Sequence, residues 1–303
     1  MYAWIIDGKL AQSPLLPKSM AKYLASAFTG VVVLLAHYEL QPLYYDYVDL
    51  LKSLGLDVLH IPTPDRYPVG LLDISRASAF IDRHVNSGGS VLVQCRGGVG
   101  RSGLVTASYL VYEGHDPYTA LTRVRSRVPG AVENKWQVQL LEDYYALTKL
   151  TRREVLTEFT KAAEKLLAVD EATYRHLSKV VQFTIELLGA LNSSNLNPED
   201  EALESMLHAH TAGARRLLES AVGCRSPGSQ SPLVELAHAL DYKMDSRVVV
   251  LDAVTSAKRH HITLLCSGPC EDIATYAQRA SSRISELIAG ELVFEWGNYL
   301  DYV

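Results

Sequence analysis

Several features that would place a protein in a special class are scarce in this sequence. Its four cysteines among 303 residues are too few for a disulfide-rich scaffold. No apolar run exceeds six residues, well short of the roughly 20 that a transmembrane helix needs. The N-terminal segment also lacks the basic and apolar regions of a signal peptide. We therefore expect a cytoplasmic protein without a membrane partner.

Basic residues do not outnumber acidic ones. The 29 lysines and arginines stand against 34 aspartates and glutamates, which gives a net charge of -5. Such a chain has no overall positive field that would attract long nucleic acids, so any anion must be bound by a local site. The length and the 48% share of hydrophobic residues are typical of about two globular domains.

The first half of the chain alternates short apolar segments with helical patterns. Residues 31–35 and 91–93 are predicted strands, whereas residues 72–85 carry apolar side chains at helical spacing. This alternation predicts an α/β domain over residues 1–150, with a central, mostly parallel sheet flanked by helices.

The second half has a different pattern. Long amphipathic segments predict helices, and Thr151 to Glu154 has the form of a capping box that starts the first of them. Strand-like runs return only near the C-terminus, at residues 247–251, 261–265 and 292–296. We predict a second, helix-rich α+β domain of unknown role over residues 151–303.

A glycine-rich segment directly follows the predicted strand at residues 91–93. It runs from Cys95 to Ser102 and leads into the helical pattern of residues 104–112. Such a turn between strand and helix exposes backbone N–H groups at a helix N-terminus, where the helix dipole also favours an anion. A nucleotide-binding phosphate loop is disfavoured, because Cys95 and Arg101 replace the glycine and lysine that it requires.

The residue types in this loop fit phosphoryl transfer. The same N–H groups favour a thiolate at Cys95, which makes this cysteine a candidate nucleophile. Arg101 can offer a fork of donors to two phosphoryl oxygens, and the Ser102 hydroxyl can stabilise the departing thiolate. A buried cysteine that only packs as a small apolar side chain is the alternative, but it leaves the glycines and the arginine unexplained. The predicted phosphate-binding residues are Arg96, Gly97, Gly98, Val99, Gly100 and Arg101.

The order of cysteine, five residues, arginine and serine resembles the signature of the cysteine-dependent protein tyrosine phosphatase superfamily. The resemblance covers about residues 1–148 and is strongest to the compact dual-specificity branch, which includes archaeal members. It implies a protein phosphatase that works through a phosphocysteine intermediate, without a cofactor or a metal ion.

The resemblance also implies roles for residues outside the loop. The family takes its general acid from an aspartate on a loop before the cysteine, and Asp65, which lies 30 residues before Cys95, fits that place. Gln137 matches the glutamine that positions the hydrolytic water. Two positions depart from the family pattern. Gln94 replaces the usual histidine before the cysteine, and the arginine expected directly before Pro129 is absent.

The same resemblance implies a phosphorylated protein as the partner. We expect phosphotyrosine as the main substrate group, with phosphoserine and phosphothreonine as further ones. Superfamily members that act on phosphoinositides tend to carry lysines between the cysteine and the arginine, and none is present here. Two alternatives stay open: a phosphopeptide-binding pseudophosphatase, and a phosphatase that acts on RNA 5′-phosphates or inositol phosphates. The sequence makes no prediction of the oligomeric state.

Two groups of residues in the second half have side chains of the types that can bind metal ions. For each group an interpretation without a metal ion is favoured. Cys266 and Cys270 have a spacing that zinc sites allow, yet a second ligand pair is missing, so two buried thiols or a disulfide are expected. A helical phosphohydrolase would use an adjacent histidine–aspartate pair as metal ligands, and the second half contains no such pair beside His208, His210 or His238. We interpret these histidines as core or helix-surface residues and predict no metal site.

Overall fold

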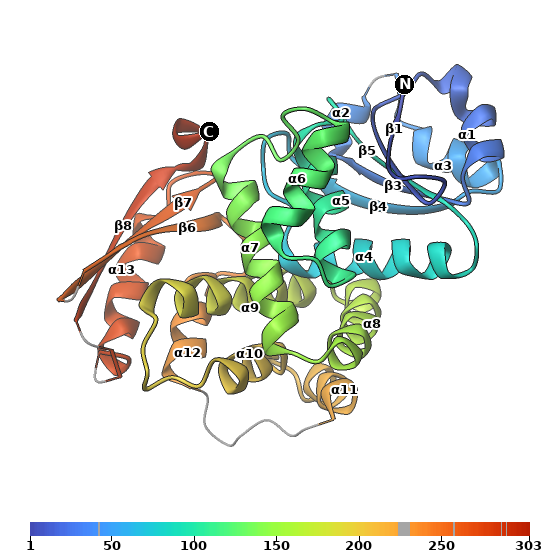
Figure 1. Ribbon diagram of the computed structural model, residues 1–303. Helices are drawn as coiled ribbons and strands as arrows, with labels where there is room; N and C mark the ends of the chain where they lie inside the picture. Colours follow the sequence, from blue (N-terminus) through green and yellow to red (C-terminus); the bar gives the residue numbers. More distant parts are fainter. Residues whose placement is uncertain (42, 224–230, 257, 286, 289) are drawn as a thin grey trace. The chain divides into compact units, whose positions relative to one another are not determined.

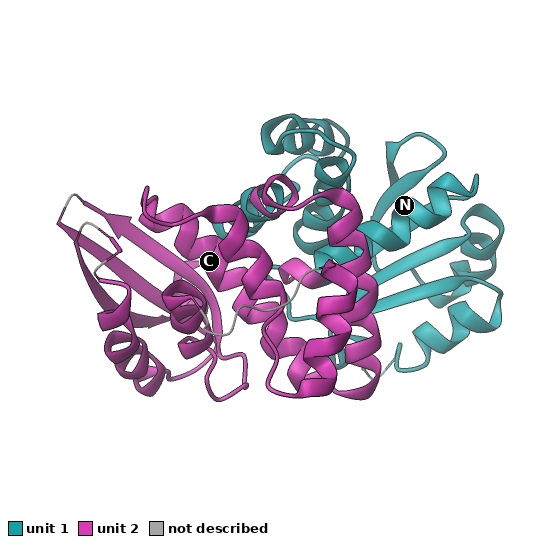
Figure 2. Ribbon diagram, turned by 90° about the horizontal axis from the view of Figure 1, so that it is seen from below, with its two compact units in different colours: residues 1–69, 73–145 teal, residues 70–72, 146–303 magenta. Residues whose placement is uncertain are grey.

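The computed structural model describes residues 1–41, 43–223, 231–256, 258–285, 287–288 and 290–303. Internal contacts divide the chain into an N-terminal unit of residues 1–69 and 73–145 and a C-terminal unit of residues 70–72 and 146–303 (Figure 2). The boundary between residues 145 and 146 falls inside a helix, α7 (Lys135–Leu150). None of the described helices is long and apolar enough to cross a membrane.

A five-stranded sheet forms the centre of the N-terminal unit, with the strand order β1-β2-β5-β3-β4. The first two strands pair antiparallel across the turn at Asp7 and Gly8. All other neighbouring strands of this sheet run parallel, which confirms the predicted mostly parallel arrangement. The strands are β1 (Ala3–Ile6), β2 (Leu10–Pro14), β3 (Gly30–Leu35), β4 (Asp57–Thr63) and β5 (Val91–Cys95).

Helices flank this sheet (Figure 1). All residues of β3 are buried, and because alternate side chains of a strand point to opposite faces, both faces of the sheet are covered. On one face Val31, Val33 and Leu35 share a core with residues of α1 and α3. The elements that accompany the sheet are η1 (Lys18–Met20), α1 (Ala21–Ala27), α2 (His37–Leu40), α3 (Tyr47–Ser53), α4 (Leu71–Asn86), α5 (Gly100–Tyr112) and α6 (Pro117–Arg127).

Helices dominate the C-terminal unit, as predicted, and a three-stranded sheet of order β6-β7-β8 completes it. Val180, Phe183 and Leu187 of α9 pack in one core with residues of this sheet, of α12 and of α13. The strands are β6 (Val248–Thr255), β7 (Arg259–Cys266) and β8 (Glu291–Asn298). The helices are α8 (Arg153–Val169), α9 (Glu171–Leu191), α10 (Pro198–Met206), α11 (Ala212–Val222), α12 (Pro232–Ala239) and α13 (Glu271–Ala280), with short turns η2 (Ser281–Arg283) and η3 (Tyr299–Tyr302).

One predicted helix start in the C-terminal unit is wrong. The capping box expected from Thr151 to Glu154 does not form, because the Thr151 hydroxyl donates to the carbonyl of Leu147 in α7 at 2.7 Å. The N-cap residue of α8 is Arg152, which makes no side-chain hydrogen bond to the helix N-terminus. A threonine can bond back to the helix before it instead of capping the helix after it.

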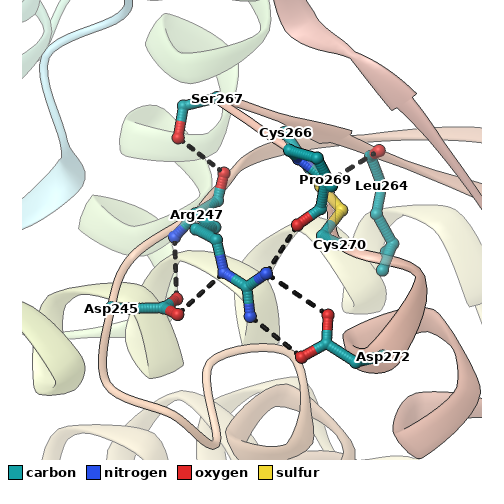
Figure 3. The surroundings of a disulfide bond; sticks show 8 residues. All are labelled: Asp245, Arg247, Leu264, Cys266, Ser267, Pro269, Cys270 and Asp272. Carbon is teal, nitrogen blue, oxygen red and sulfur yellow. Dashed lines mark hydrogen bonds and ion pairs between the residues drawn. A yellow bond between two sulfur atoms is a disulfide. The ribbon is translucent and has the colours of Figure 1, made fainter.

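Cys266 and Cys270 form a disulfide where β7 ends and α13 begins (Figure 3). Both cysteines are buried. Arg247 braces the same turn, because its guanidinium donates to the carbonyl of Pro269 and to the carboxylate of Asp272. The hydrogen bond from Arg247 also holds the pKa of Asp272 well below its usual value. The disulfide is one of the two arrangements expected for these cysteines, and it leaves no thiolate at this turn for zinc.

Candidate active site

The loop between β5 and α5 has a conformation that its glycines allow. β5 ends at Cys95, and α5 begins at Gly100. Gly98 adopts a left-handed backbone with a φ of +70°, and a Cβ atom there would clash with the backbone of Pro14. The Gly98 carbonyl also accepts a hydrogen bond of 2.8 Å from the side chain of Gln12 in β2. The neighbouring strand therefore fixes the shape of this loop.

Cys95 lies at the start of the loop with only 2% of its surface exposed. Its sulfur accepts a hydrogen bond from the N–H of Gly98 at 3.2 Å and lies 3.2 Å from Ser102 Oγ. Both groups can donate to a thiolate, and the N-terminal end of α5 favours negative charge as well. The candidate nucleophile is thus in direct contact with the hydroxyl that can stabilise it.

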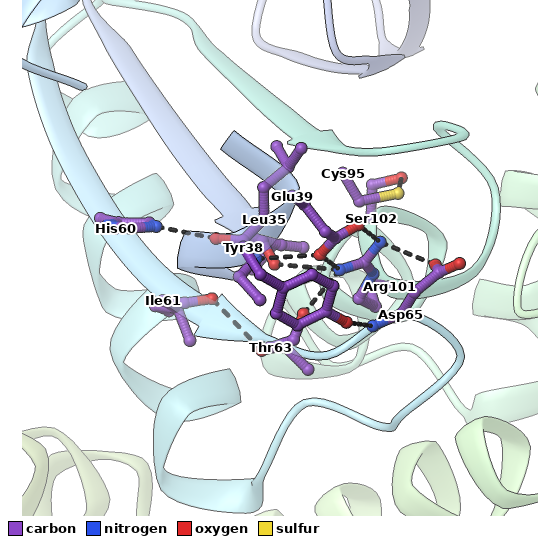
Figure 4. A network of polar contacts seen from close by, with 12 residues as sticks. Leu35, Tyr38, Glu39, His60, Ile61, Thr63, Asp65, Cys95, Arg101 and Ser102 are labelled. Atoms are coloured by element: carbon purple, nitrogen blue, oxygen red, sulfur yellow. Dashed lines mark hydrogen bonds and ion pairs between the residues drawn. The ribbon is translucent and has the colours of Figure 1, made fainter. Parts of the chain in front are cut away.

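Arg101 is buried, and oxygen atoms surround its guanidinium (Figure 4). Nη1 and Nη2 donate to the two carboxylate oxygens of Glu39 at 2.6 and 2.8 Å. Nη1 also donates to the carbonyl of Thr63 at 2.6 Å, and Nη2 donates to Asp65 Oδ1 at 2.8 Å. Burial disfavours the charge, but the hydrogen bond with Glu39 and the nearby acidic groups outweigh burial and raise the pKa of Arg101. The guanidinium is therefore charged and held in one orientation.

Asp65 lies in the turn that follows β4. Its N–H donates to the hydroxyl of Tyr38 at 3.2 Å, and its side chain, which is 48% exposed, forms the ion pair with Arg101. Arg66 has a left-handed φ of 67°, and its carbonyl accepts a hydrogen bond from Asn134 Nδ2 at 2.9 Å. The structure thus brings the candidate general acid next to the arginine of the loop.

Gln94, which replaces the histidine usual in the family, is buried and forms hydrogen bonds through both atoms of its amide group. Gln94 Oε1 accepts a hydrogen bond of 2.9 Å from the hydroxyl of Tyr47. Gln94 Nε2 donates to Ser13 Oγ at 3.2 Å and to the carbonyl of Pro14 at 3.4 Å. Burial raises the pKa of Tyr47 to about 12, so the tyrosine hydroxyl keeps its proton and remains a donor. Gln94 therefore ties the end of β5 to β2 and α3.

Gln137 lies against the same loop. A Cβ atom at Gly100 would be 3.0 Å from Gln137 Nε2, and it would clash with the carboxylate of Glu133. Gln137 Oε1 accepts the N–H of Glu133 at 3.0 Å, whereas Nε2 is buried and has no hydrogen-bond partner among the described residues. A buried amide donor beside an anion loop can hold a water molecule there.

Arg125 anchors the segment that precedes α7. Its Nε and Nη2 donate to the carbonyls of Ala131 and Val132 at 2.9 and 3.0 Å. Val132 has a left-handed φ of 59°, and its N–H donates to the carbonyl of Val99 in the loop at 3.3 Å. An arginine thus fixes the segment after Pro129, although it does not directly precede that proline.

Nothing in the sequence marks Glu39 as part of this site. The residue lies in the short helix α2, 62 positions before Arg101. The N–H of Ala36 donates to Glu39 Oε2 at 2.9 Å, which orients the carboxylate toward the guanidinium. Only the parallel packing of β3 beside β5 brings α2 to the loop, so no local spacing could have predicted this pair.

Comparisons with known proteins bear on the same part of the chain. Residues 17–115 match the family model described as "Polymorphic toxin system, DSP-PTPase phosphatase". Tk-PTP in its active form is 34% identical over 48% of this chain and 95% of its own, with a TM-score of 0.44. PTPMT1 is 21% identical over 48% and 94% of the two chains, with a TM-score of 0.44. Human DUSP28 is 22% identical over 49% and 95%, with a TM-score of 0.41.

The N-terminal unit belongs to the cysteine-dependent protein tyrosine phosphatase superfamily, in its compact dual-specificity branch. The loop that begins at Cys95 lies within the residues that the family model matches. The family model ends at residue 115, and the phosphatase structures above cover about half of this chain. Residues 146–303 thus lie beyond the part of the chain that the family model matches.

Four histidines of the C-terminal unit, outside this phosphatase match, bring their rings together. His176 comes from α9, His208 and His210 from the segment between α10 and α11, and His238 from α12. One ring nitrogen of each lies within 4.8 Å of the others. Burial lowers the pKa of His208 to about 2 and that of His238 to about 4, so these two rings are neutral. The structure joins residues that the sequence treats as separate core or surface positions.

Proposed function

We propose that the N-terminal unit hydrolyses phosphate monoesters through a phosphocysteine intermediate, with protein phosphotyrosine as its main substrate. The observation that carries this proposal is the contact of Cys95 Sγ with the Gly98 N–H and the Ser102 hydroxyl, beside a guanidinium oriented by Glu39. This arrangement supports a stabilised thiolate next to a binding site for phosphoryl oxygens.

In the first step the Cys95 thiolate attacks phosphorus. An S–P bond forms while the P–O bond to the leaving group breaks. Arg101 and the N–H groups of residues 96–101 hold the phosphoryl oxygens, over which the charge of the transition state is spread. Asp65 in its protonated form gives its proton to the leaving oxygen. The ion pair between Asp65 and Arg101 opens when the phosphoryl group binds, and the exposed side chain of Asp65 has room to turn away.

In the second step water hydrolyses the phosphocysteine. The buried amide of Gln137 beside the loop supports its role in positioning this water molecule. Asp65 accepts a proton from the water while a new P–O bond forms. The S–P bond breaks, its electron pair returns to Cys95, and the hydroxyl of Ser102 donates to the thiolate. Inorganic phosphate then leaves, and the enzyme returns to its starting state.

An aromatic ring beside Asp65 supports an aryl phosphate as the substrate. Tyr38 is 62% exposed, and its hydroxyl accepts the N–H of Asp65 (Figure 4). A ring next to the residue that protonates the leaving group can pack against the ring of phosphotyrosine. Aliphatic leaving groups gain less from this contact.

The test is hydrolysis of p-nitrophenyl phosphate by the full chain and by its Cys95→Ser variant. We expect turnover to fall by about 10⁴-fold or more in the variant, because serine lacks the thiolate. A matched control is Cys224→Ser, which removes a thiol that is distant from the loop in the sequence. Mass spectrometry after acid quenching should find phosphate on the wild-type peptide that contains Cys95.

A substrate panel then tests the specificity. It compares a phosphotyrosine peptide, a phosphoserine peptide, an inositol phosphate and a 5′-phosphorylated RNA at equal concentrations. We expect the highest kcat/KM for phosphotyrosine. A higher value for the RNA or the inositol phosphate would show that the substrate assignment is wrong. Binding of the phosphotyrosine peptide without turnover would favour the pseudophosphatase alternative.

A further inference from the structure

The four histidine rings of the C-terminal unit form a nearly regular tetrahedron. Every distance between two ring centroids lies between 4.9 and 5.2 Å. Imidazoles that bind a central ion through bonds of about 2.0–2.1 Å place their centroids about 5 Å apart in a tetrahedral site. The spacing of the rings therefore matches the spacing around a common ligand.

Three ring nitrogens of this cluster approach one another closely. His176 Nε2, His208 Nε2 and His238 Nδ1 are 3.0 to 3.2 Å apart in every pair. A ring nitrogen of a neutral imidazole carries either a proton or a lone pair, so at least two of the three are alike and repel each other. A bound cation removes this conflict because it accepts all three lone pairs.

Asp241 orients His176 for such a cation. Asp241 Oδ2 lies 2.9 Å from His176 Nδ1, and Asp241 Oδ1 accepts the N–H of Ser246 at 2.8 Å. Because a carboxylate only accepts hydrogen bonds, Nδ1 of this histidine carries the proton and Nε2 presents its lone pair. Metal-binding histidines usually donate their second N–H to a carboxylate or carbonyl in this way. Both side chains are 1% exposed, so the pair is part of the core.

We propose that His176, His208, His210 and His238 bind one divalent transition-metal ion, and that this ion is Zn²⁺. Imidazole nitrogens bind zinc, copper, nickel and iron, and the tetrahedral arrangement of four of them favours zinc. Four side chains fill a tetrahedral shell and leave no position for water or substrate, so the role of the ion is structural. It fastens α9, the connection between α10 and α11, and α12 to one another. His210 is the exposed member and closes the site toward solvent.

The metal content of the full chain tests this proposal. The purified protein is stripped with EDTA, dialysed and titrated with Zn²⁺, and in parallel with Ni²⁺ and Co²⁺. We expect one Zn²⁺ per chain by elemental mass spectrometry and a tetrahedral absorption spectrum for bound Co²⁺. We also expect the melting temperature to fall by at least about 5 °C after stripping and to recover with Zn²⁺.

Three variants distinguish the metal ligand His208 from Asp241, which orients the ligand His176. His208→Gln should abolish stoichiometric Zn²⁺ binding, whereas Asp241→Asn should weaken it by about 10 to 100-fold. The control is His261→Gln, an exposed histidine of β7 outside the cluster, which should bind Zn²⁺ like the wild type. Circular dichroism establishes that each variant is folded.

Several results would overturn the proposal. A folded wild-type chain that takes up none of the three ions contains no metal site. Full Zn²⁺ affinity in His208→Gln would place the metal elsewhere, and an octahedral Co²⁺ spectrum would exclude the closed, structural shell. If a variant fails to fold, the stripping and the Co²⁺ spectrum of the wild type decide alone.

Discussion

The two sites of this protein hold buried polar groups in different ways. The loop from Cys95 to Ser102 is built from consecutive residues, and the N–H of Gly98 and the hydroxyl of Ser102 in the first turn of α5 contact the sulfur. The histidine cluster instead collects side chains from α9, α12 and the connection between α10 and α11. Local conformation forms the first site, whereas only the packing of separate helices forms the second.

The two sites also differ in how charge is balanced. Arg101 has the carboxylates of Glu39 and Asp65 as its counterions. In the cluster, ring nitrogens of different histidines face one another, and the carboxylate of Asp241 contacts the opposite nitrogen of His176. We therefore expect substitutions in the loop to reduce turnover at little cost in stability. Substitutions in the cluster should reduce stability at little cost in turnover.

The largest effect that sharpens this contrast is expected for Asp65→Asn. The amide keeps the size of the side chain but cannot protonate the leaving oxygen, so kcat should fall by about 10² to 10⁴-fold. Because Asp65 is about half exposed, the free energy of unfolding should change by no more than about 0.5 kcal/mol. The measurements are kcat for p-nitrophenyl phosphate as a function of pH and denaturation in urea.

The matched control for this substitution is Asp49→Asn, which neutralises an exposed carboxylate of α3. It should leave kcat and the pH profile unchanged. An unchanged kcat in Asp65→Asn would show that another group protonates the leaving oxygen, and the role of the turn after β4 would have to be reassigned.

The difference between a site formed by local conformation and one formed by helix packing also decides how much of the molecule can be predicted from its sequence. The strand, the glycines and the helix around Cys95 are consecutive, so hydrophobic periodicity and residue type suffice to predict the loop. The mostly parallel sheet follows from the alternation of strands and helices over residues 1–150. Asp65 was predicted from its position relative to Cys95, through a family resemblance and not through local structure.

The residues that could not be predicted are those joined only by tertiary structure. Glu39 reaches Arg101 because two parallel strands place α2 beside the loop. His176 meets His208 because α9 packs against the end of α10. The spacing of these residues along the chain carries no information about their contact, since helix packing decides which faces meet.

Glu39→Gln tests a residue to which the contrast between the two sites does not apply. Glu39 belongs to the loop site but is supplied by tertiary structure, and its carboxylate is fully buried in the ion pair with Arg101. Loss of this charge leaves the guanidinium with Asp65 as its remaining counterion. We expect kcat/KM to fall by about 10 to 100-fold and the unfolding free energy to fall by about 3 kcal/mol.

Inhibition by inorganic phosphate separates a positioning role of Glu39 from a general loss of stability. If Glu39 orients the guanidinium, the inhibition constant for phosphate should rise in the variant at temperatures where the protein is fully folded. Glu142→Gln, which changes an exposed carboxylate of α7, is the control. Normal phosphate binding by folded Glu39→Gln would mean that the loop orients Arg101 without help.

The smallest expected effect concerns α9, the helix that also carries His176. The buried carboxylate of Glu186 accepts hydrogen bonds from Gln182 Nε2 at 2.7 Å and from the N–H of Leu251 at 2.8 Å. Burial nevertheless raises the pKa of Glu186 from 4.5 to about 7. Between these two values the folded chain keeps a proton that the unfolded chain loses, so this residue lowers stability as the pH rises through that window.

Glu186→Gln is uncharged at every pH and should remove this dependence. Relative to the wild type, the unfolding free energy of the variant should rise by about 2 kcal/mol between pH 5 and pH 8, measured by urea denaturation. Titration of the histidines cancels in this difference, because both proteins contain them. Glu171→Gln, at an exposed position of α9, should show no such trend. A difference independent of pH would mean that Glu186 stays ionised when buried. Zn²⁺ binding should be unchanged in Glu186→Gln, which would show that α9 can change in stability without losing its metal ligand.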